Sequence, residues 1–330
     1  MNSPRSGKSS ASWGRRKPDP LEEAGYASKG DVKLLDVKAQ EAYYDTIVAR
    51  YTRFCTTRPS EGAFRLLPRI SPNASTSNPP IAPAPNPPAD SPATQKPAHR
   101  VLKNPKNSTP HVKSAEQELT TILLALRKLR EAILATKDRT PVSFAQRVHI
   151  LCIRVGILSE HPPTFYPPLK RLLTELDTEA NPLSHATLQE FTSYMILDTA
   201  CRREDFGEAY LLREKARARF CYRSHLVDDI LSSIINENWV LFWEARKAAD
   251  AYTKVFVDWA APWIRRRTLK SIAASYITVD LRFIIKCCTG EEDGMTWEEL
   301  VELEGLGWRL EGDKVIIKKI KPKAALTAAT

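Results

Sequence analysis

The stretch RRRTLKSIAASYITVDLRFIIKCC (Arg265–Cys288), followed by TWEELVELEGLGWRLEGDKVIIKK (Thr296–Lys319), decides the expected fold of this chain. The first part reads as an apolar helix and then a second helix. The second part reads as a short acidic helix, begun by a capping box of Thr296 and Glu299, and then a two-stranded hairpin. Glu311–Lys314 supplies the turn, because Gly and Asp favour turns. We therefore expect a compact C-terminal module over residues 262–320.

The order of elements in that module is the order of a winged helix, and the chain before it is a run of amphipathic helices. Ser114 with Gln117 forms a capping box at the first of these, and Ser184 caps another. A joint at Asp205–Gly207 returns one helix onto the next, as in one unit of a tetratricopeptide-like (TPR-like) solenoid. No fixed repeat period is visible. The expected fold is mainly α, with TPR-like helical repeats over residues 114–261 and the winged helix at 262–320.

The N-terminal third of the chain has a different composition. Residues 31–57 read as one helix, and five apolar residues spaced by three, four or eight lie near one face of it: Leu35, Tyr43, Ile47, Tyr51 and Phe54. This helix must dock either on the chain's own core or in a partner's groove. Residues 58–113 hold thirteen of the 24 prolines and are expected to be a disordered linker. A disordered basic tail is expected at residues 1–30, and a flexible tail at residues 321–330.

Composition limits the partners and the compartment. The net charge of +10 permits contact with nucleic acid or with an acidic protein surface. The six cysteines include no Cys-x-x-Cys pair, so no metal site is expected, and those within apolar stretches should act as small hydrophobes. No apolar run reaches the ~20 residues that span a bilayer, so no membrane contact is expected. A cytoplasmic and/or nuclear location follows from the cysteine usage.

Two stretches resemble the PCI superfamily, whose members are subunits of the proteasome lid, the signalosome and a translation-initiation factor. EFTSYMIL (Glu190–Leu197) followed by ACRREDFGEAYLL is similar to the helical-repeat segment of that superfamily. NWVLFWEARKAADAY (Asn238–Tyr252), followed by the run from Arg265, resembles the passage from the last repeat into the winged helix. The resemblance covers residues 114–319 and implies the small-subunit branch or, as second choice, the GANP-type mRNA-export branch. It implies no catalytic residues.

The acidic helix is the first candidate site. Glu298, Glu299 and Glu302 would repel a DNA backbone, so this helix is expected to contact a protein partner instead of reading bases. The second candidate is a basic patch that would contact phosphates or an acidic partner: Arg265, Arg266, Arg267, Lys270 and Lys319. The first three of these are expected at a helix N-terminus, where cations oppose the helix dipole. This unfavourable placement indicates either a functional role for the arginines or an acidic neighbour such as Asp258. The alternative interpretation of the patch is a solvated helix face with no binding role.

An enzyme is not expected. No Gly-rich phosphate loop, G-x-S-x-G elbow or H-E-x-x-H motif occurs, and no cofactor is predicted. His149 is expected in the core, and the tryptophans spaced by four (239, 243, 259 and 263) are expected to pack instead of stacking on bases. The expected function is a non-catalytic scaffold subunit that binds other PCI-type subunits. The alternative is a nuclear ribonucleoprotein component with a weak RNA contact through the basic patch.

Overall fold

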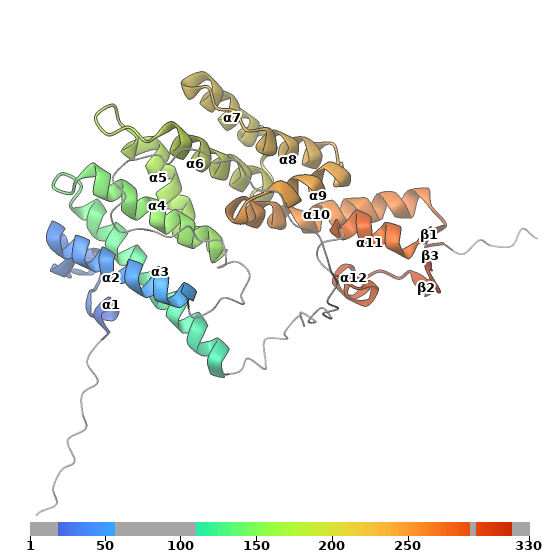
Figure 1. Cartoon of the computed structure of the whole chain (residues 1–330), viewed down its shortest axis with the longest axis horizontal. Helices are drawn as coiled ribbons and strands as arrows, with labels where there is room; N and C mark the ends of the chain where they lie inside the picture. The colour runs from blue at the N-terminus through green and yellow to red at the C-terminus, as the bar shows by residue number, and fades with distance from the viewer. Residues whose placement is uncertain (1–18, 57–109, 291–294, 319–330) are drawn as a thin grey trace, which may run out of the picture. The chain divides into compact units, whose positions relative to one another are not determined.

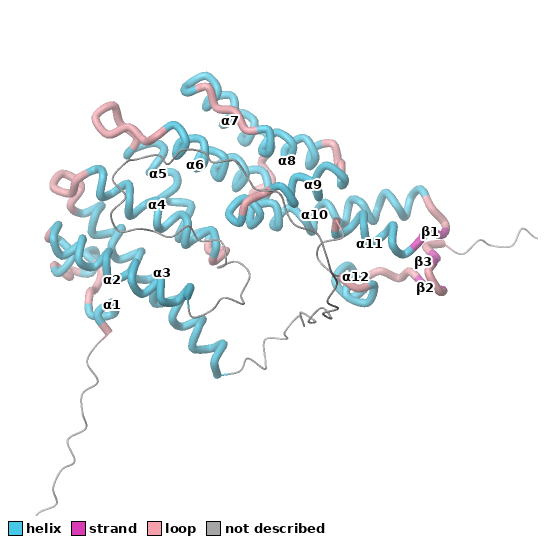
Figure 2. Tube along the Cα trace, viewed as in Figure 1, coloured by secondary structure: helices cyan, strands magenta, loops and turns pink. Residues whose placement is uncertain are grey.

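The computed structural model describes residues 19–56, 110–290 and 295–318, with side chains from residue 115 onward in the second range. Within these ranges the chain forms twelve α-helices and one small three-stranded sheet. Figure 2 shows the three strands close together and the remaining described residues as helices and loops. The chain divides into two compact units, one ending at Pro141 and the other beginning at Val142. The mainly α fold predicted from the sequence is confirmed.

The N-terminal unit is built from α1 (Pro20–Glu23), α2 (Val37–Thr56) and α3 (Pro110–Ala135), with short 3₁₀ turns before α2. α2 packs along α3 (Figure 1). Four of the five residues predicted for its apolar face are buried: Tyr43, Ile47, Tyr51 and Phe54. Leu35 precedes the helix, and Leu34 is buried there instead. α3 begins at Pro110, four residues before the predicted start, because proline suits the first helical position.

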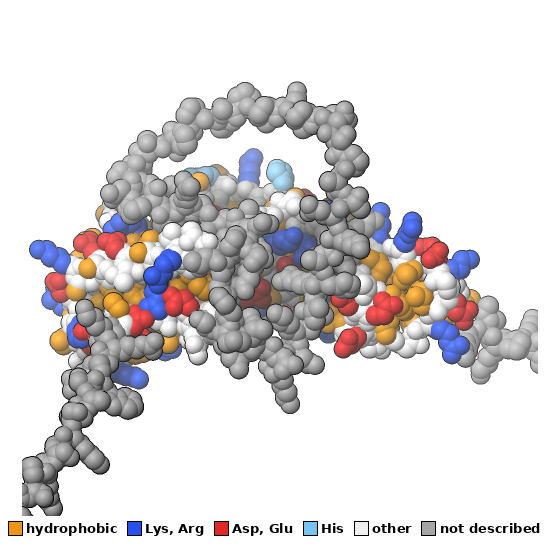
Figure 3. Space-filling model, turned by 60° about the horizontal axis from the view of Figure 1, so that its bottom comes forward, with side chains coloured by type: hydrophobic (Ala, Val, Ile, Leu, Met, Phe, Trp, Pro, Cys, Tyr) orange, Lys and Arg blue, Asp and Glu red, His pale blue; other side chains and the backbone are white. Residues whose placement is uncertain are grey.

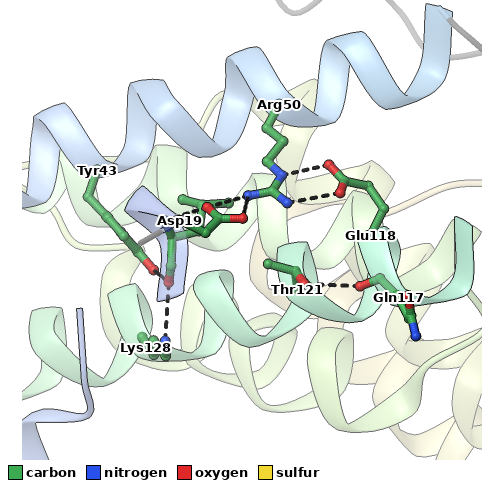
Figure 4. Close-up of polar contacts among 8 residues, drawn as sticks. Asp19, Tyr43, Arg50, Gln117, Glu118, Thr121 and Lys128 are labelled. Carbon is green, nitrogen blue, oxygen red and sulfur yellow. Dashed lines mark hydrogen bonds and ion pairs between the residues drawn. The ribbon is translucent and has the colours of Figure 1, made fainter. Parts of the chain in front are cut away.

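Residues 19–30 were predicted to belong to a disordered tail, and this prediction is wrong. Asp19 caps α1 by accepting a hydrogen bond from the Leu21 amide at 3.0 Å, and the Leu21 side chain is buried. The Leu21 carbonyl accepts bonds from the Tyr43 hydroxyl and the Lys128 ammonium, at 2.8 and 3.1 Å (Figure 4). Residues 1–18, the predicted linker at 58–109 and the predicted tail at 321–330 lie outside the described residues. Residues 110–113 were predicted as linker but belong to α3.

Arg50 of α2 joins this segment to α3. Its guanidinium donates to the Asp19 carboxylate at 2.6 Å and to both Glu118 oxygens at 2.6 and 2.9 Å (Figure 4). These bonds lower the pKa of the Asp19 and Glu118 carboxyls below their ordinary values. One half-buried arginine therefore ties three elements of the N-terminal unit together.

Acidification should loosen this unit. Because both folded pKa values are depressed, the ionised carboxylates contribute fully above the unfolded values of 3.8 and 4.5 and lose their contribution as pH falls through the folded ones. Arg50→Met should destabilise the unit by about 1–2 kcal/mol at pH 7, since the carboxylates stay partly solvated, and should flatten its stability loss between pH 5 and about 3. Amide hydrogen exchange of α2, followed at several pH values, measures the stability of the unit and its dependence on pH. Lys33→Met, which breaks an exposed pair with Glu23, is the control, and an equal effect of both variants would contradict the prediction.

The C-terminal unit continues the helical chain and ends in the strands (Figure 1). Its elements are α4 (Val142–Leu158), α5 (Pro162–Arg171), α6 (His185–Leu197), α7 (Phe206–Phe220), α8 (His225–Ile235), α9 (Trp239–Ala248), α10 (Ala251–Ser275), β1 (Thr278–Asp280), α11 (Leu281–Thr289), α12 (Trp297–Glu304), β2 (Arg309–Glu311) and β3 (Lys314–Ile316). α4 packs on α5, α6 on α7, and α8 on α9. α10 is the central helix, in contact with α4, α6, α8, α9 and α11.

The predicted boundary between residues 261 and 262 falls inside α10. This helix begins after its cap at Asp250 and continues through Pro262 to Ser275. Arg265, Arg266 and Arg267 therefore lie in the body of a helix, not at its N-terminus. The unfavourable interaction with the helix dipole that was inferred for these arginines from the sequence does not arise, because the dipole acts mainly on charges in the first and last turns of a helix.

The sheet is antiparallel with strand order β1-β3-β2. The predicted hairpin is present: Leu310 pairs with Val315, and Gly312 takes a positive φ of 59° in the turn. β1 was not predicted from the sequence, and its Val279 pairs with Val315 from the other side. β3 is thus the central strand, which explains why Val315 is fully buried.

The packing roles assigned to unusual side chains also hold. His149 is buried on α4, and its Nδ1 donates to the Ala145 carbonyl at 2.7 Å. Cys152, Cys201 and one of the adjacent pair Cys287 and Cys288 were predicted to act as small hydrophobes, and all four are buried. The Trp243 indole donates to the Cys287 carbonyl at 2.9 Å, which fixes α9 against α11.

Candidate functional site

The candidate site lies on the surface of the segment from the second half of α10 to β3. One cluster of buried residues forms the core beneath it: Leu269, Ile272, Val279, Ile284, Cys287, Cys288, Trp297, Leu300 and Val315. These residues come from α10, both following helices and two strands, so the segment shares a single core. This shared core therefore holds the surface residues of the segment in fixed positions.

The acidic helix α12 presents two of its three predicted carboxylates to solvent. The predicted capping box is confirmed: the Glu299 carboxylate accepts from the Thr296 amide at 2.9 Å, and the Thr296 hydroxyl accepts from the Glu299 amide at 3.2 Å. Glu299 is thus occupied in starting the helix. Glu298 and Glu302 are exposed and four residues apart, which places them on one side of α12.

Arg265 does not belong to an exposed basic patch, because it is only 6% exposed. Its Nε donates to the Cys288 carbonyl at 3.2 Å, and its terminal nitrogen lies 3.4 Å from the carboxylate of Glu304. Glu304 is itself buried, with 7% of its side chain exposed. The pair ties α10 to the end of α11 and to α12, so Arg265 supports the fold and cannot reach a phosphate.

Three of the remaining predicted cations are at the surface of α10. Arg266 is 71% exposed and lies 3.5 Å from Glu304, while Arg267 is 46% exposed and lies 3.3 Å from Glu237. The Arg267 guanidinium also stacks over the Trp263 ring at 5.3 Å. Lys270 is exposed. Lys319 lies outside the described residues.

The acidic neighbours of these arginines differ from the one expected from the sequence. Asp258 pairs with Arg246 at 2.6 Å, not with residues 265–267. Glu304 and Glu237 take that place instead, and both lie more than 25 residues away along the chain. They partly neutralise the patch, which weakens its attraction for phosphate.

An aromatic surface beside β1 was not found from the sequence. Tyr276, Ile277 and Phe283 are exposed, and the Phe283 ring lies 6.2 Å from Tyr276 and 6.3 Å from Trp239. β1 is one edge of the sheet and β2 is the other. Hydrophobic side chains are visible among charged ones on the face shown in Figure 3. The SYITVD stretch, with its β-branched residues, was the available signal for this edge.

The described residues include no cluster of metal ligands, and the two buried thiols of this segment are not activated. Burial raises the pKa of the Cys287 and Cys288 thiols to about 12, so neither is a thiolate at neutral pH. In the ranges that the structure covers, no group of three or more His, Cys, Asp or Glu side chains could hold a metal ion. A search of the same residues for a helix long and apolar enough to cross a membrane finds none.

Comparison with known proteins adds no family to these observations: no family model matches the chain, and no curated protein matches its sequence. The function is therefore inferred from this chain's own residues and their geometry.

Proposed function

We propose that this chain is a non-catalytic, PCI-like scaffold subunit of a multiprotein complex of the signalosome, proteasome-lid or initiation-factor type. In this proposal α4–α9 are degenerate TPR-like helical repeats, and the segment from the second half of α10 to β3 is a winged helix. The repeats offer a surface for elongated partners, and the winged helix docks on the equivalent module of another subunit.

One observation carries the proposal: helix, strand, helix, helix and hairpin follow one another around a single core, with strand order β1-β3-β2. That order, with its small antiparallel sheet, fits a winged helix. The pairwise packing of α4 on α5, α6 on α7 and α8 on α9 supports helical repeats.

The docking surface in this proposal is the exposed side of α12 or an edge strand of the small sheet. Glu298 and Glu302 face solvent, and Leu303 is exposed beside them. The buried side of the same helix, through Trp297 and Leu300, holds it on the core. Charge on a rigid helix gives a partner a defined register and orientation.

The test is affinity capture of the tagged chain from nuclease-treated and untreated extract. Recovery of other PCI-type subunits in stoichiometric amount, regardless of nuclease, is the expected result. Glu298→Lys with Glu302→Lys should reduce that recovery at least tenfold, because reversing two charges in an interface costs several kcal/mol. Glu244→Lys on α9, an exposed acid outside the docking surface, should leave recovery unchanged. Full recovery with the double variant would remove α12 from the interface, and no PCI-type partner at all would refute the proposed function.

The second candidate function is a GANP-type nuclear ribonucleoprotein component, and the exposure of Arg266 and Lys270 favours it. In that case partners would be lost on nuclease treatment. Arg266→Glu with Lys270→Glu should then abolish RNA binding, and binding by the unaltered chain should weaken steeply with salt. Arg265 is unsuitable for this test because its replacement would disturb the core.

A further inference from the structure

A cavity of about 340 Å³ lies between the end of α7 and the start of α8. Figure 1 shows where these two helices lie in the chain. Its wall comes from one short segment: Arg217, Cys221, Tyr222, Arg223, Ser224, His225 and Asp228. Cys221 adopts the left-handed conformation, with φ 57°, and its amide closes the end of α7. This conformation reverses the chain and turns the side chains that follow into the cavity wall. The cavity shares no residue with the proposed docking surface on α12 or with the basic residues of α10.

Hydrogen-bond donors dominate this wall. Arg217, Arg223 and His225 all have ring or guanidinium nitrogens that can donate. The one carboxylate in the wall, Asp228, already accepts from Arg213 at 2.6 Å and from Arg217 at 3.4 Å. The Tyr222 hydroxyl is bonded to Ser193 at 2.8 Å and the side chain is buried. The free capacity of the cavity is therefore that of a cationic donor site.

The two arginines differ in how they are held. Arg217 lies between Glu214 at 3.0 Å and Asp228 at 3.4 Å, so two carboxylates fix its position and leave donors unused. Arg223 is exposed, and no carboxylate of the described ranges pairs with it. A fixed and an uncompensated guanidinium in the wall of one cavity suit an anion with several acceptor oxygens. A phosphate monoester has three such oxygens and nearly two negative charges at pH 7.

We propose that this cavity binds a single phosphate group on a phosphorylated protein segment. The surface around it favours a peptide over nucleic acid, because it is not uniformly basic. Glu214 is 57% exposed beside Arg217, and Asp229 is exposed next to the wall. A polyanionic backbone running across this surface would meet these carboxylates, whereas one phosphate on a neutral peptide would not.

The test uses the full chain and a fluorescein-labelled glycine–alanine peptide with one central phosphoserine. The same peptide with serine or glutamate at that position is the comparison. We expect the phosphopeptide to bind at least tenfold more tightly than either. Arg223→Gln should weaken that binding at least tenfold without destabilising the fold, since this side chain has no described partner. Arg219→Gln, which removes an equal charge from a pair with Asp177 outside the cavity, should change it less than twofold.

Three results would overturn the proposal. One is equal binding of the phosphoserine and serine peptides. Another is an equal loss in Arg219→Gln and Arg223→Gln, which would indicate a general charge effect. The third is an RNA oligonucleotide or inorganic phosphate that binds as tightly as the phosphopeptide and is equally sensitive to Arg223→Gln, which would assign the cavity to nucleic acid or to a free anion.

Discussion

Replacing Phe256 with alanine should lower the free energy of unfolding of the C-terminal unit by about 3–5 kcal/mol, because the deletion leaves a large cavity in a fully buried site. Phe256 is the centre of an aromatic cluster. Its ring lies 5.8 Å from Phe165 of α5, 5.6 Å from Tyr194 of α6 and 5.4 Å from Trp259 of α10. These rings join three helices, so the surroundings cannot collapse into the space without moving a helix.

Tryptophan fluorescence during urea or thermal unfolding measures this effect. Six of the seven tryptophans lie after Val142, so their emission follows the C-terminal unit: Trp239, Trp243, Trp259, Trp263, Trp297 and Trp308. A loss of 3–5 kcal/mol corresponds to a fall in Tm of roughly 6–20 °C. Phe283→Ala is the matched control, because this phenylalanine is 40% exposed and its removal should cost less than about 1 kcal/mol. Equal effects of the two variants would mean that the aromatic cluster does not organise α5, α6 and α10.

Replacing Arg265 with leucine should destabilise the same unit by about 3 kcal/mol or more. The change leaves the buried Glu304 carboxylate without its closest buried cation and removes the donor to the Cys288 carbonyl. Arg266 lies 3.5 Å from the other Glu304 oxygen but is largely solvated, so it compensates only in part. We therefore expect the effect near the lower end of the range for broken buried pairs.

A double variant separates the ion pair from general damage to the core. Arg265→Leu with Glu304→Leu removes both charges, so it should be clearly more stable than the sum of the two single changes predicts. Arg267→Ala, on the exposed side of α10, should change stability by less than about 1 kcal/mol. Additive effects in the double variant would show that Arg265 and Glu304 do not interact.

The role of Arg265 also bears on the choice between protein and RNA partners. A loss of RNA or partner binding in an Arg265 variant would be expected from destabilisation alone, because the ion pair of Arg265 with Glu304 holds α10 to the C-terminal end of α12. Arg266 and Lys270 avoid this ambiguity since both are exposed. The predicted patch of five cations is therefore reduced, among the residues that the structure describes, to three at the surface, two of which have acidic neighbours.

Features that depend on neighbouring residues were determined by the sequence alone. The Thr296–Glu299 capping box, the cap at Ser184, the apolar face of α2 and the turn at Gly312 were each predicted and are present. In all four, the groups that interact are within a few turns of chain, so residue type and spacing suffice. The mainly α fold follows from the sum of such local signals.

Features that depend on distant residues were decided only by the tertiary structure. β1 is a strand because β3, more than 30 residues later, supplies its hydrogen bonds, and residues 19–30 are ordered because Arg50 and Lys128 bind them. Arg265 resembles its neighbours Arg266 and Arg267 in sequence, yet the packing of α11 and α12 buries it and leaves them exposed. Burial and ion pairing depend on which helices and strands are in contact in the folded chain, and the local spacing of residues carries no information about those tertiary contacts.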